Sequence, residues 1–137
     1  MNLKEYKIQI ALGSISLDDK KRIAMNENTS VRVLELLSRD EDWCVRSYVA
    51  MNKNTPISVL EKLSKDKDNG VRCMVVENEN TSDKILKLLS KDKDSFIRSM
   101  VVENENISIE TLKYLSKDKD YYFREKARRR LDELEGV

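Results

Sequence analysis

Apolar residues recur along this chain at a fixed spacing of 26 residues, and the copies follow one another without insertion or deletion. Each copy contains two leucines three residues apart, with a serine directly after the second. The aligned positions are Leu34, Leu60, Leu86 and Leu112, then Leu37, Leu63, Leu89 and Leu115, then Ser38, Ser64, Ser90 and Ser116. A repeat of this length is typical of a solenoid, in which each unit buries its apolar face only against its neighbours.

Each copy predicts two short helices, as the segment 54–79 illustrates. Its first apolar stripe has helical spacing and follows Thr55, the expected N-cap, and Pro56, which suits the first helical position. The polar run 64–68 ends this helix, and Asp68 is placed to cap the second one. Both helices span about two or three turns, so stacking against neighbouring units must stabilise them. For one of the two, the pattern is compatible with either an α-helix or a 3₁₀-helix.

The end of each second helix carries an asparagine at one phase of the repeat, as at Asn52, Asn78 and Asn104. We expect these asparagines to end their helices, because asparagine tolerates the left-handed backbone conformation found there. Their side chains or backbones should then satisfy groups that the chain reversal leaves open. The leucines expected to be nearly fully buried are Leu60, Leu63, Leu86 and Leu89.

The two ends of the chain depart from the repeat, as the terminal units of an array do. Near the N-terminus, Ile8, Ile10 and Leu12 are expected to supply an apolar face. Near the C-terminus, Arg130 stands where the repeat predicts an asparagine, so the last helix should continue, with residues 128–130 facing water. Both ends are therefore predicted to be caps.

The pattern predicts an all-α fold, a helical-repeat solenoid that forms a single domain over residues 1–137. Its 26-residue units contain two helices each, in an α/α or α/3₁₀ arrangement. The expected boundaries are 1–27 for a degenerate N-terminal cap and 28–53, 54–79, 80–105 and 106–131 for the repeats, the last extended into a C-terminal cap helix to about 135.

The run Asn-x-Asn-Thr-Pro-x-x-x-Leu-x-x-Leu-Ser, followed by Asp-x-x-Val-Arg-x-x-Val, resembles the leucine-rich repeat variant family, which is close in style to HEAT-like repeats. The match covers residues 26–127 and is most specific at 52–56 and at Asp68, Val71 and Arg72. The resemblance implies a right-handed superhelix of alternating short α and 3₁₀ helices. The founding type of the family also holds an iron–sulfur centre in an N-terminal cysteine cluster. Residues 1–25 contain no cysteine, so this cofactor is not carried over.

Composition narrows the function further. Lys and Arg total 26 against 25 Asp and Glu, a formal net charge of +1, which disfavours a dedicated nucleic-acid or anionic-membrane binder. The chain has no apolar run long enough to span a membrane and no signal-peptide pattern at its start, so we expect a cytoplasmic protein without membrane contact.

The sequence has no histidine, which excludes Ser-His-Asp and Cys-His catalysis and His-ligated metals. We expect no cofactor, and Cys44 and Cys73 are expected to be free structural thiols.

Two charged series follow the same period and allow two interpretations. They are Arg46, Arg72, Arg98 and Arg124, with Asp40, Asp66, Asp92 and Asp118. A row of guanidinium groups could track a phosphate backbone, as in the HEAT-like alkylpurine DNA glycosylases. Alternatively, the series form a structural ladder, since an arginine in the first turn of a helix opposes the helix dipole and calls for a neutralising carboxylate. We favour the ladder, with partners for Arg72 and Arg98 expected among Asp66, Asp68, Asp92 and Asp94.

Aromatic residues near the starts of second helices are candidate partner-binding positions: Trp43, Phe96, Tyr121 and Tyr122. Asn69 and Ser95 occupy the place of Trp43 and Tyr121 in other copies, and a position taken by such residues is usually exposed. Exposed rings on a rigid array suit partner binding. The alternative is that these rings cover the loop of the preceding unit.

The sequence therefore predicts a non-catalytic scaffold that binds another protein and is a monomer. The alternative is a nucleic-acid binding module that uses the Arg and Lys positions of a HEAT-like array. An enzyme that relies on Asp and Glu is the third and remotest option, because no catalytic arrangement is recognisable.

Overall fold

A computed structural model describes residues 1–136 of the chain, and this part is helical without any β-strand. The helices are α1 (Leu3–Ala11), α2 (Leu17–Met25), α3 (Val31–Leu37), α4 (Trp43–Met51), α5 (Ile57–Leu63), α6 (Asn69–Glu77), α7 (Asp83–Leu89), α8 (Ser95–Glu103), α9 (Ile109–Leu115) and α10 (Tyr121–Glu135). The all-α prediction is confirmed. Every helix in the described range is α, so the 3₁₀ alternative, including the alternation implied by the family resemblance, does not apply there.

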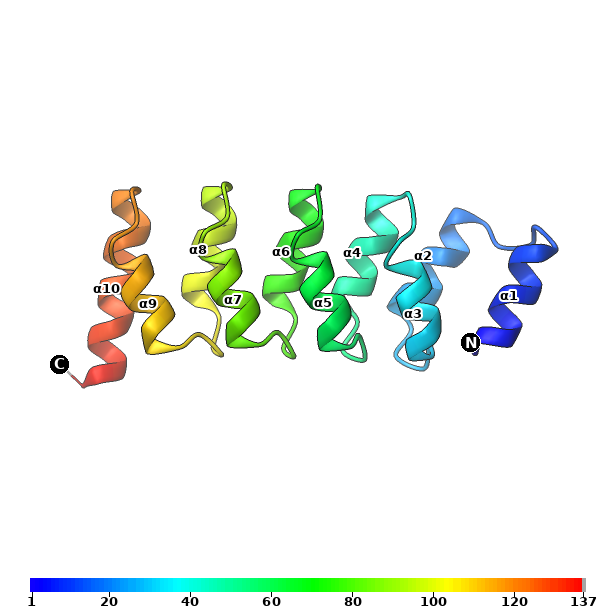
Figure 1. Cartoon of the computed structure of the whole chain (residues 1–137), viewed down its shortest axis with the longest axis horizontal. Helices are drawn as coiled ribbons and strands as arrows, with labels where there is room; N and C mark the ends of the chain where they lie inside the picture. The colour runs from blue at the N-terminus through cyan, green and yellow to red at the C-terminus, as the bar shows by residue number, and fades with distance from the viewer. Residues whose placement is uncertain (137) are drawn as a thin grey trace. The chain divides into compact units, whose positions relative to one another are not determined.

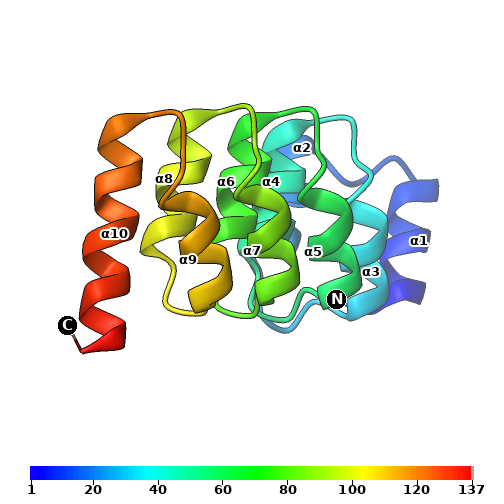
Figure 2. The same ribbon diagram turned by 60° about the vertical axis from the view of Figure 1, so that its left-hand side comes forward.

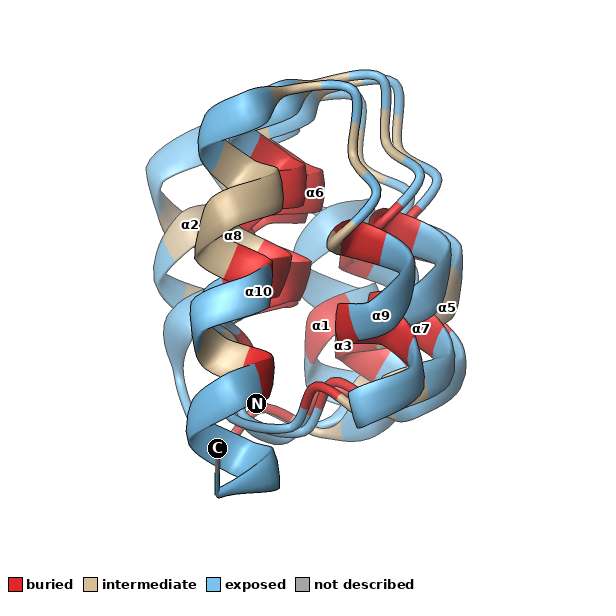
Figure 3. Cartoon of the chain, turned by 90° about the vertical axis from the view of Figure 1, so that its left-hand side faces the viewer, coloured by how far each residue is buried: buried red, intermediate tan, exposed pale blue. Residues whose placement is uncertain are grey.

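The helices form two compact units, residues 1–80 and a second unit that begins at Thr81. In the first unit, α2, α4 and α6 pack side by side, while α3 and α5 cover one flank of that row (Figure 1). In the second unit, α7 and α9 pack in the same manner against α8 and α10 (Figure 2). Buried residues line the sides of the helices that face each other within each unit (Figure 3).

The apolar core follows the leucine pattern. Leu60 and Leu86 are completely buried, and Leu63 and Leu89 are 3% and 1% exposed, so the predicted core positions are confirmed. The predicted N-terminal apolar face is wrong, because Ile8, Ile10 and Leu12 are all exposed. The side chain that α1 buries is Tyr6 instead.

The start of α5 differs from the prediction at Thr55. Pro56 is the N-cap of this helix and provides no side-chain cap, and the helix itself begins at Ile57. The hydroxyl of Thr55 donates to the carbonyl of Val49 at 2.5 Å, at the end of α4. This hydroxyl is buried, and bonding a carbonyl of the preceding helix satisfies it without solvent.

The second helices begin and end as the sequence indicates. The carboxylate of Asp68 accepts a hydrogen bond from the backbone N–H of Gly70 at 2.8 Å, which confirms the predicted cap. Asn78 follows the last residue of α6, and its side-chain amide donates to the carbonyls of Ala50 and Asn52 at 2.7 and 3.1 Å. Asparagine therefore ends the helix and bonds carbonyls at the end of the preceding second helix, as predicted.

The conformation of these asparagines is not the predicted one. Asn78 has φ −66° and ψ 125°, and Asn52 and Asn104 are extended in the same way. No residue other than glycine has a positive φ in the described part of the chain. For Asn52 and Asn78, the extended conformation aims the amide back at carbonyls at the end of the preceding second helix.

Arg130 replaces asparagine at this phase, and the structure explains how the chain tolerates the change. Helix α10 continues past it to Glu135, and the C-cap Gly136 has φ 72°. The Arg130 side chain donates a hydrogen bond to the carbonyl of Val102, 28 residues earlier, which is the spacing that joins Asn78 to Ala50. The prediction that Arg130 faces water is therefore wrong, because its longer side chain makes the asparagine's contact; Arg128 and Arg129 are exposed as predicted.

No helix among residues 1–136 combines the length and the apolar character needed to cross a bilayer.

Candidate functional site

Three loops that precede second helices share the sequence Lys-Asp-Lys-Asp; we call residues 65–68, 91–94 and 117–120 the Lys-Asp loops. Exposure alternates along each loop, with exposed lysines and half-buried aspartates. Hydrogen bonds hold the aspartates inward. The carboxylate of the first aspartate in each loop accepts the backbone N–H of the second aspartate, and the carboxylate of the second aspartate caps the helix. The lysine side chains are consequently left on the outside.

Below the Lys-Asp loops lie buried arginine–aspartate pairs. In the second unit, Arg98 Nε donates to Asp118 Oδ2 at 2.8 Å and Arg98 Nη2 to Oδ1 at 3.3 Å, with both side chains 6% exposed. In the first unit, Arg46 binds Asp66 in the same bidentate way at 2.7 and 3.0 Å. In each pair the carboxylate lies 20 residues after the arginine, in the next copy of the repeat. The prediction for Arg98 is therefore wrong, because its carboxylate partner is Asp118 and not one of the four aspartates expected.

The aspartate six residues before each arginine has a different role from the expected one. Its backbone carbonyl, not its carboxylate, accepts from the guanidinium, as in the 2.9 Å bond from Arg98 Nη1 to Asp92. Arg72 and Arg124 make the same bond at 2.8 Å, to the carbonyls of Asp66 and Asp118. Each of these arginines thus fastens the loop before its own helix. The sequence pattern did not reveal this, because it specifies residue types and not which atom of the aspartate faces the arginine.

At the two ends of the series the contacts differ. Lys20 takes the arginine's place near the N-terminus and binds Asp40 at 2.7 Å. At the other end, the Arg124 guanidinium lies 5.3 Å from the ring centroid of Tyr121, a cation–π contact.

The arginines set the protonation state of their partners. Burial by itself would raise the pKa of the Asp118 carboxyl, but the hydrogen bonds from Arg98 and from the backbone N–H of Asp120 outweigh it and hold the pKa below its ordinary value of 3.8. The pKa of Asp66 is lowered in the same way by Arg46 against its burial. Both carboxylates are therefore ionised at neutral pH, and their charges are matched by the guanidinium groups.

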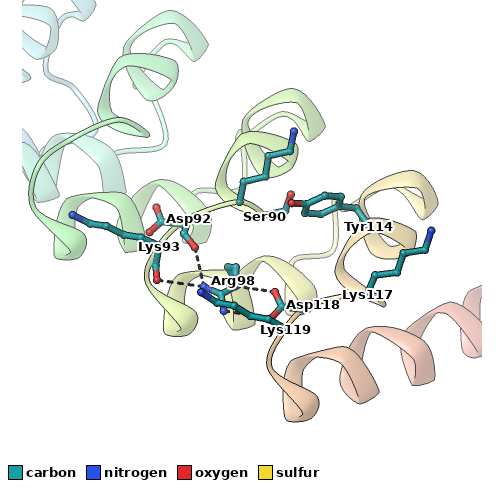
Figure 4. A pocket seen from close by; sticks show the side chains of 9 residues that line it. Ser90, Asp92, Lys93, Arg98, Tyr114, Lys117, Asp118 and Lys119 are labelled. Carbon is teal, nitrogen blue, oxygen red and sulfur yellow. Dashed lines mark hydrogen bonds and ion pairs between the residues drawn. The ribbon is translucent and has the colours of Figure 1, made fainter.

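A pocket of about 380 Å³ opens between two Lys-Asp loops of the second unit. Four lysines line it, Lys91, Lys93, Lys117 and Lys119, together with Arg98 and Tyr114. Figure 4 shows the guanidinium of Arg98 bonded to Asp118 and to the backbone of the loop before it, with the Lys119 side chain beside it and Lys93 and Lys117 extending away. The Nζ atom of Lys91 lies 5.5 Å from the ring centroid of Tyr114.

The four lysines of this pocket are exposed. None of them forms an ion pair with a carboxylate within residues 1–136. Tyr114 and these lysines are the functional candidates that the sequence reasoning missed. The signal was the strict Lys-Asp alternation of the loops, because aspartates that cap helices and bind arginines leave the intervening lysines exposed.

The four aromatic candidates fall into two groups. In the first unit, Trp43 lies against the start of the following second helix, since a Cβ atom added to Gly70 would lie 3.3 Å from its ring. In the second unit, Phe96, Tyr121 and Tyr122 are 62%, 68% and 64% exposed. Tyr122 also meets Phe123 edge to face, with ring centroids 5.5 Å apart.

Other chemistry is sparse in the described residues. Cys44 and Cys73 are free thiols, as expected. No group of three or more cysteine or carboxylate side chains among residues 1–136 is placed to hold a metal ion.

Comparisons with protein-family models, with curated proteins and with solved structures each found no match to this chain.

Proposed function

We propose that this chain is a non-catalytic helical-repeat scaffold that binds another protein. In this proposal its 26-residue, two-helix units form a right-handed solenoid, capped at both ends, of the leucine-rich repeat variant and HEAT-like type. Helices that start 26 residues apart, at 31, 57, 83 and 109 and again at 43, 69, 95 and 121, support the repeat. We also propose that the protein acts as a monomer in the cytoplasm.

The observation that carries the proposal is the group of exposed rings in the second unit, Phe96, Tyr121 and Tyr122. Large aromatic side chains that lie in contact with solvent are the usual anchors of protein interfaces. The backbone beneath them is held in place, because Asp94 and Asp120 cap the helices by accepting the N–H of Phe96 and Tyr122 at 2.9 Å each. Rings held on a fixed backbone lose little further freedom when a partner binds.

The repeat itself indicates that folding does not need these rings. Asn69 occupies the position of Tyr121 in α6, and Gly70 occupies the position of Phe96 and Tyr122. Because α6 forms with these small or polar residues, the aromatic residues in the second unit are an addition that binding can explain.

Nucleic-acid binding through the arginine series is the alternative, and the geometry disfavours it. Phosphate recognition needs guanidinium groups free to replace counterions. Arg46 and Arg98 are instead buried and bound bidentately to Asp66 and Asp118.

A variant of the full-length protein tests the proposal. Replacing Phe96 with Ser, Tyr121 with Asn and Tyr122 with Ser removes the three rings and introduces small polar residues. The matched control is Leu12→Ser, which removes an apolar side chain that is 75% exposed outside this group.

We expect immobilised wild-type protein and the control to retain the same proteins from an extract of the source cell, measured by quantitative mass spectrometry. The triple variant should lose most of that retention while its circular dichroism and melting temperature stay close to wild type. Unchanged retention by a folded triple variant contradicts the proposal.

A further inference from the structure

We propose that the pocket between the two Lys-Asp loops of the second unit binds an acidic polypeptide segment, rich in Asp and Glu, of the partner protein. This inference rests on the proposed function, since it assigns a chemistry to the partner.

Basic side chains outnumber acidic ones in the lining of the pocket. Five basic side chains line it against two acidic ones, Asp92 and Asp118. Asp118 is bound to Arg98, and the carboxylate of Asp92 accepts the backbone N–H of Asp94 at 2.9 Å. Both acids are thus already bonded, and none of the four exposed lysines forms an ion pair with a carboxylate within residues 1–136. Lysine ammonium groups in this state attract a chain that supplies carboxylates.

The equivalent hollow in the first unit shows which charges of the lining the repeat requires and which belong to this pocket alone. That hollow lies beside the loop 39–42 and is lined by two basic residues, Lys20 and Arg39, against three acidic ones, Asp40, Glu41 and Asp42. Glu41 occupies the repeat position of Lys93. The repeat therefore accepts a glutamate where the pocket has a lysine, and the positive charge of the pocket is not a structural requirement.

Tyr114 adds a second type of contact. Its ring is 50% exposed, lines the pocket and lies within cation–π distance of Lys91. The phenol also offers a hydrogen-bond donor to a carboxylate or to a peptide carbonyl. A polypeptide can use both the ring and the ammonium groups.

The surroundings favour a short acidic peptide over a nucleic acid. Lysines next to the pocket on α7 and α9 are already paired, Lys87 with Glu110 at 2.5 Å and Lys113 with Glu135 at 3.2 Å. The unpaired positive charge of this region is therefore concentrated in the two loops and does not continue along the helices. A phosphate backbone needs a longer track of free cations, whereas a few carboxylates match four ammonium groups.

The test measures fluorescence anisotropy of a fluorescein-labelled peptide of eight glutamates, titrated with the full-length protein at low salt. The reversal variant carries Lys93→Glu and Lys119→Glu; Glu41 stands at the same repeat position as both. The control carries Lys4→Glu and Lys7→Glu, two exposed positions on α1, and has the same net charge. We expect saturable binding by wild type, a loss of about tenfold or more in the reversal variant and a change of less than about twofold in the control.

A labelled eight-nucleotide oligothymidylate is titrated in parallel. Weaker binding of this probe than of the glutamate peptide supports the proposal, and tighter binding that the reversal variant abolishes overturns it in favour of nucleic acid. No binding of the glutamate peptide, or equal loss in both variants, overturns it as well. If the peptide experiment contradicts this proposal but the aromatic triple variant still loses its protein partners, the proposed function stands. The two experiments therefore distinguish a failure of this proposal from a failure of the proposed function.

Discussion

Arg98 is the residue whose removal tests the ladder most directly. Its guanidinium binds both oxygens of Asp118 and donates to the carbonyls of Asp92 and Lys93. In Arg98→Ala, the Asp118 carboxylate, whose side chain is 6% exposed beside Arg98, would lose both guanidinium bonds and keep its bond from the N–H of Asp120. Breaking a buried pair by removing one partner typically costs about 3–5 kcal/mol, because a buried charge is left without compensation.

The magnitude can be separated into its parts with a double-mutant cycle. Asp118→Ala and the double variant remove the acid and the whole pair, and the double variant should be less destabilised than the sum of the single changes by about 1–3 kcal/mol. Arg128→Ala is the surface control, since its bridge to Glu125 is exposed and should contribute less than about 1 kcal/mol. The free energies of unfolding are measured by urea titration with circular dichroism at neutral pH.

Two results would refute the reasoning. One is an Arg98→Ala variant no less stable than Arg128→Ala. The other is additivity within about 0.5 kcal/mol across the cycle, because residues that share a buried pair must couple. Either result would mean that the ion pair is not what holds the loop on its helix.

Three further predictions follow from the geometry. Folding lowers the pKa values of Asp66 and Asp118. Their stabilising contribution is therefore complete well above pH 3.8 and is lost as the pH falls through the lowered values. Urea midpoints measured from pH 7 to 3 should fall more steeply for wild type than for Asp118→Asn. Leu86→Ala should cost about 2–5 kcal/mol, since the side chain is completely buried, and an unchanged melting temperature would contradict the core assignment. Asn78→Ala should cost about 1–3 kcal/mol, because the Ala50 carbonyl loses this donor and the Asn52 carbonyl keeps only the N–H of Thr55, while Asn80→Ala, at an exposed position, should cost less in the same urea titration.

The sequence by itself determined the features that depend on residues a few positions apart. The leucine spacing placed Leu60 and Leu86 in the core, Asp68 marked the start of α6, and Asn78 marked its end. Helix periodicity and capping act over about one turn, so the sequence contains the information for them directly. The same reasoning located the arginine series but not the atoms that its members bind.

Tertiary structure decided what each side chain meets beyond its own helix. The carboxylate that binds Arg98 comes from 20 residues later, the hydroxyl of Thr55 turns back to α4, and Arg130 reaches a carbonyl 28 residues away. Packing also left Ile8 exposed and gathered the lysines of two loops around one pocket. These outcomes depend on how neighbouring helix pairs pack, and a buried polar group takes whichever partner that packing brings within hydrogen-bond distance.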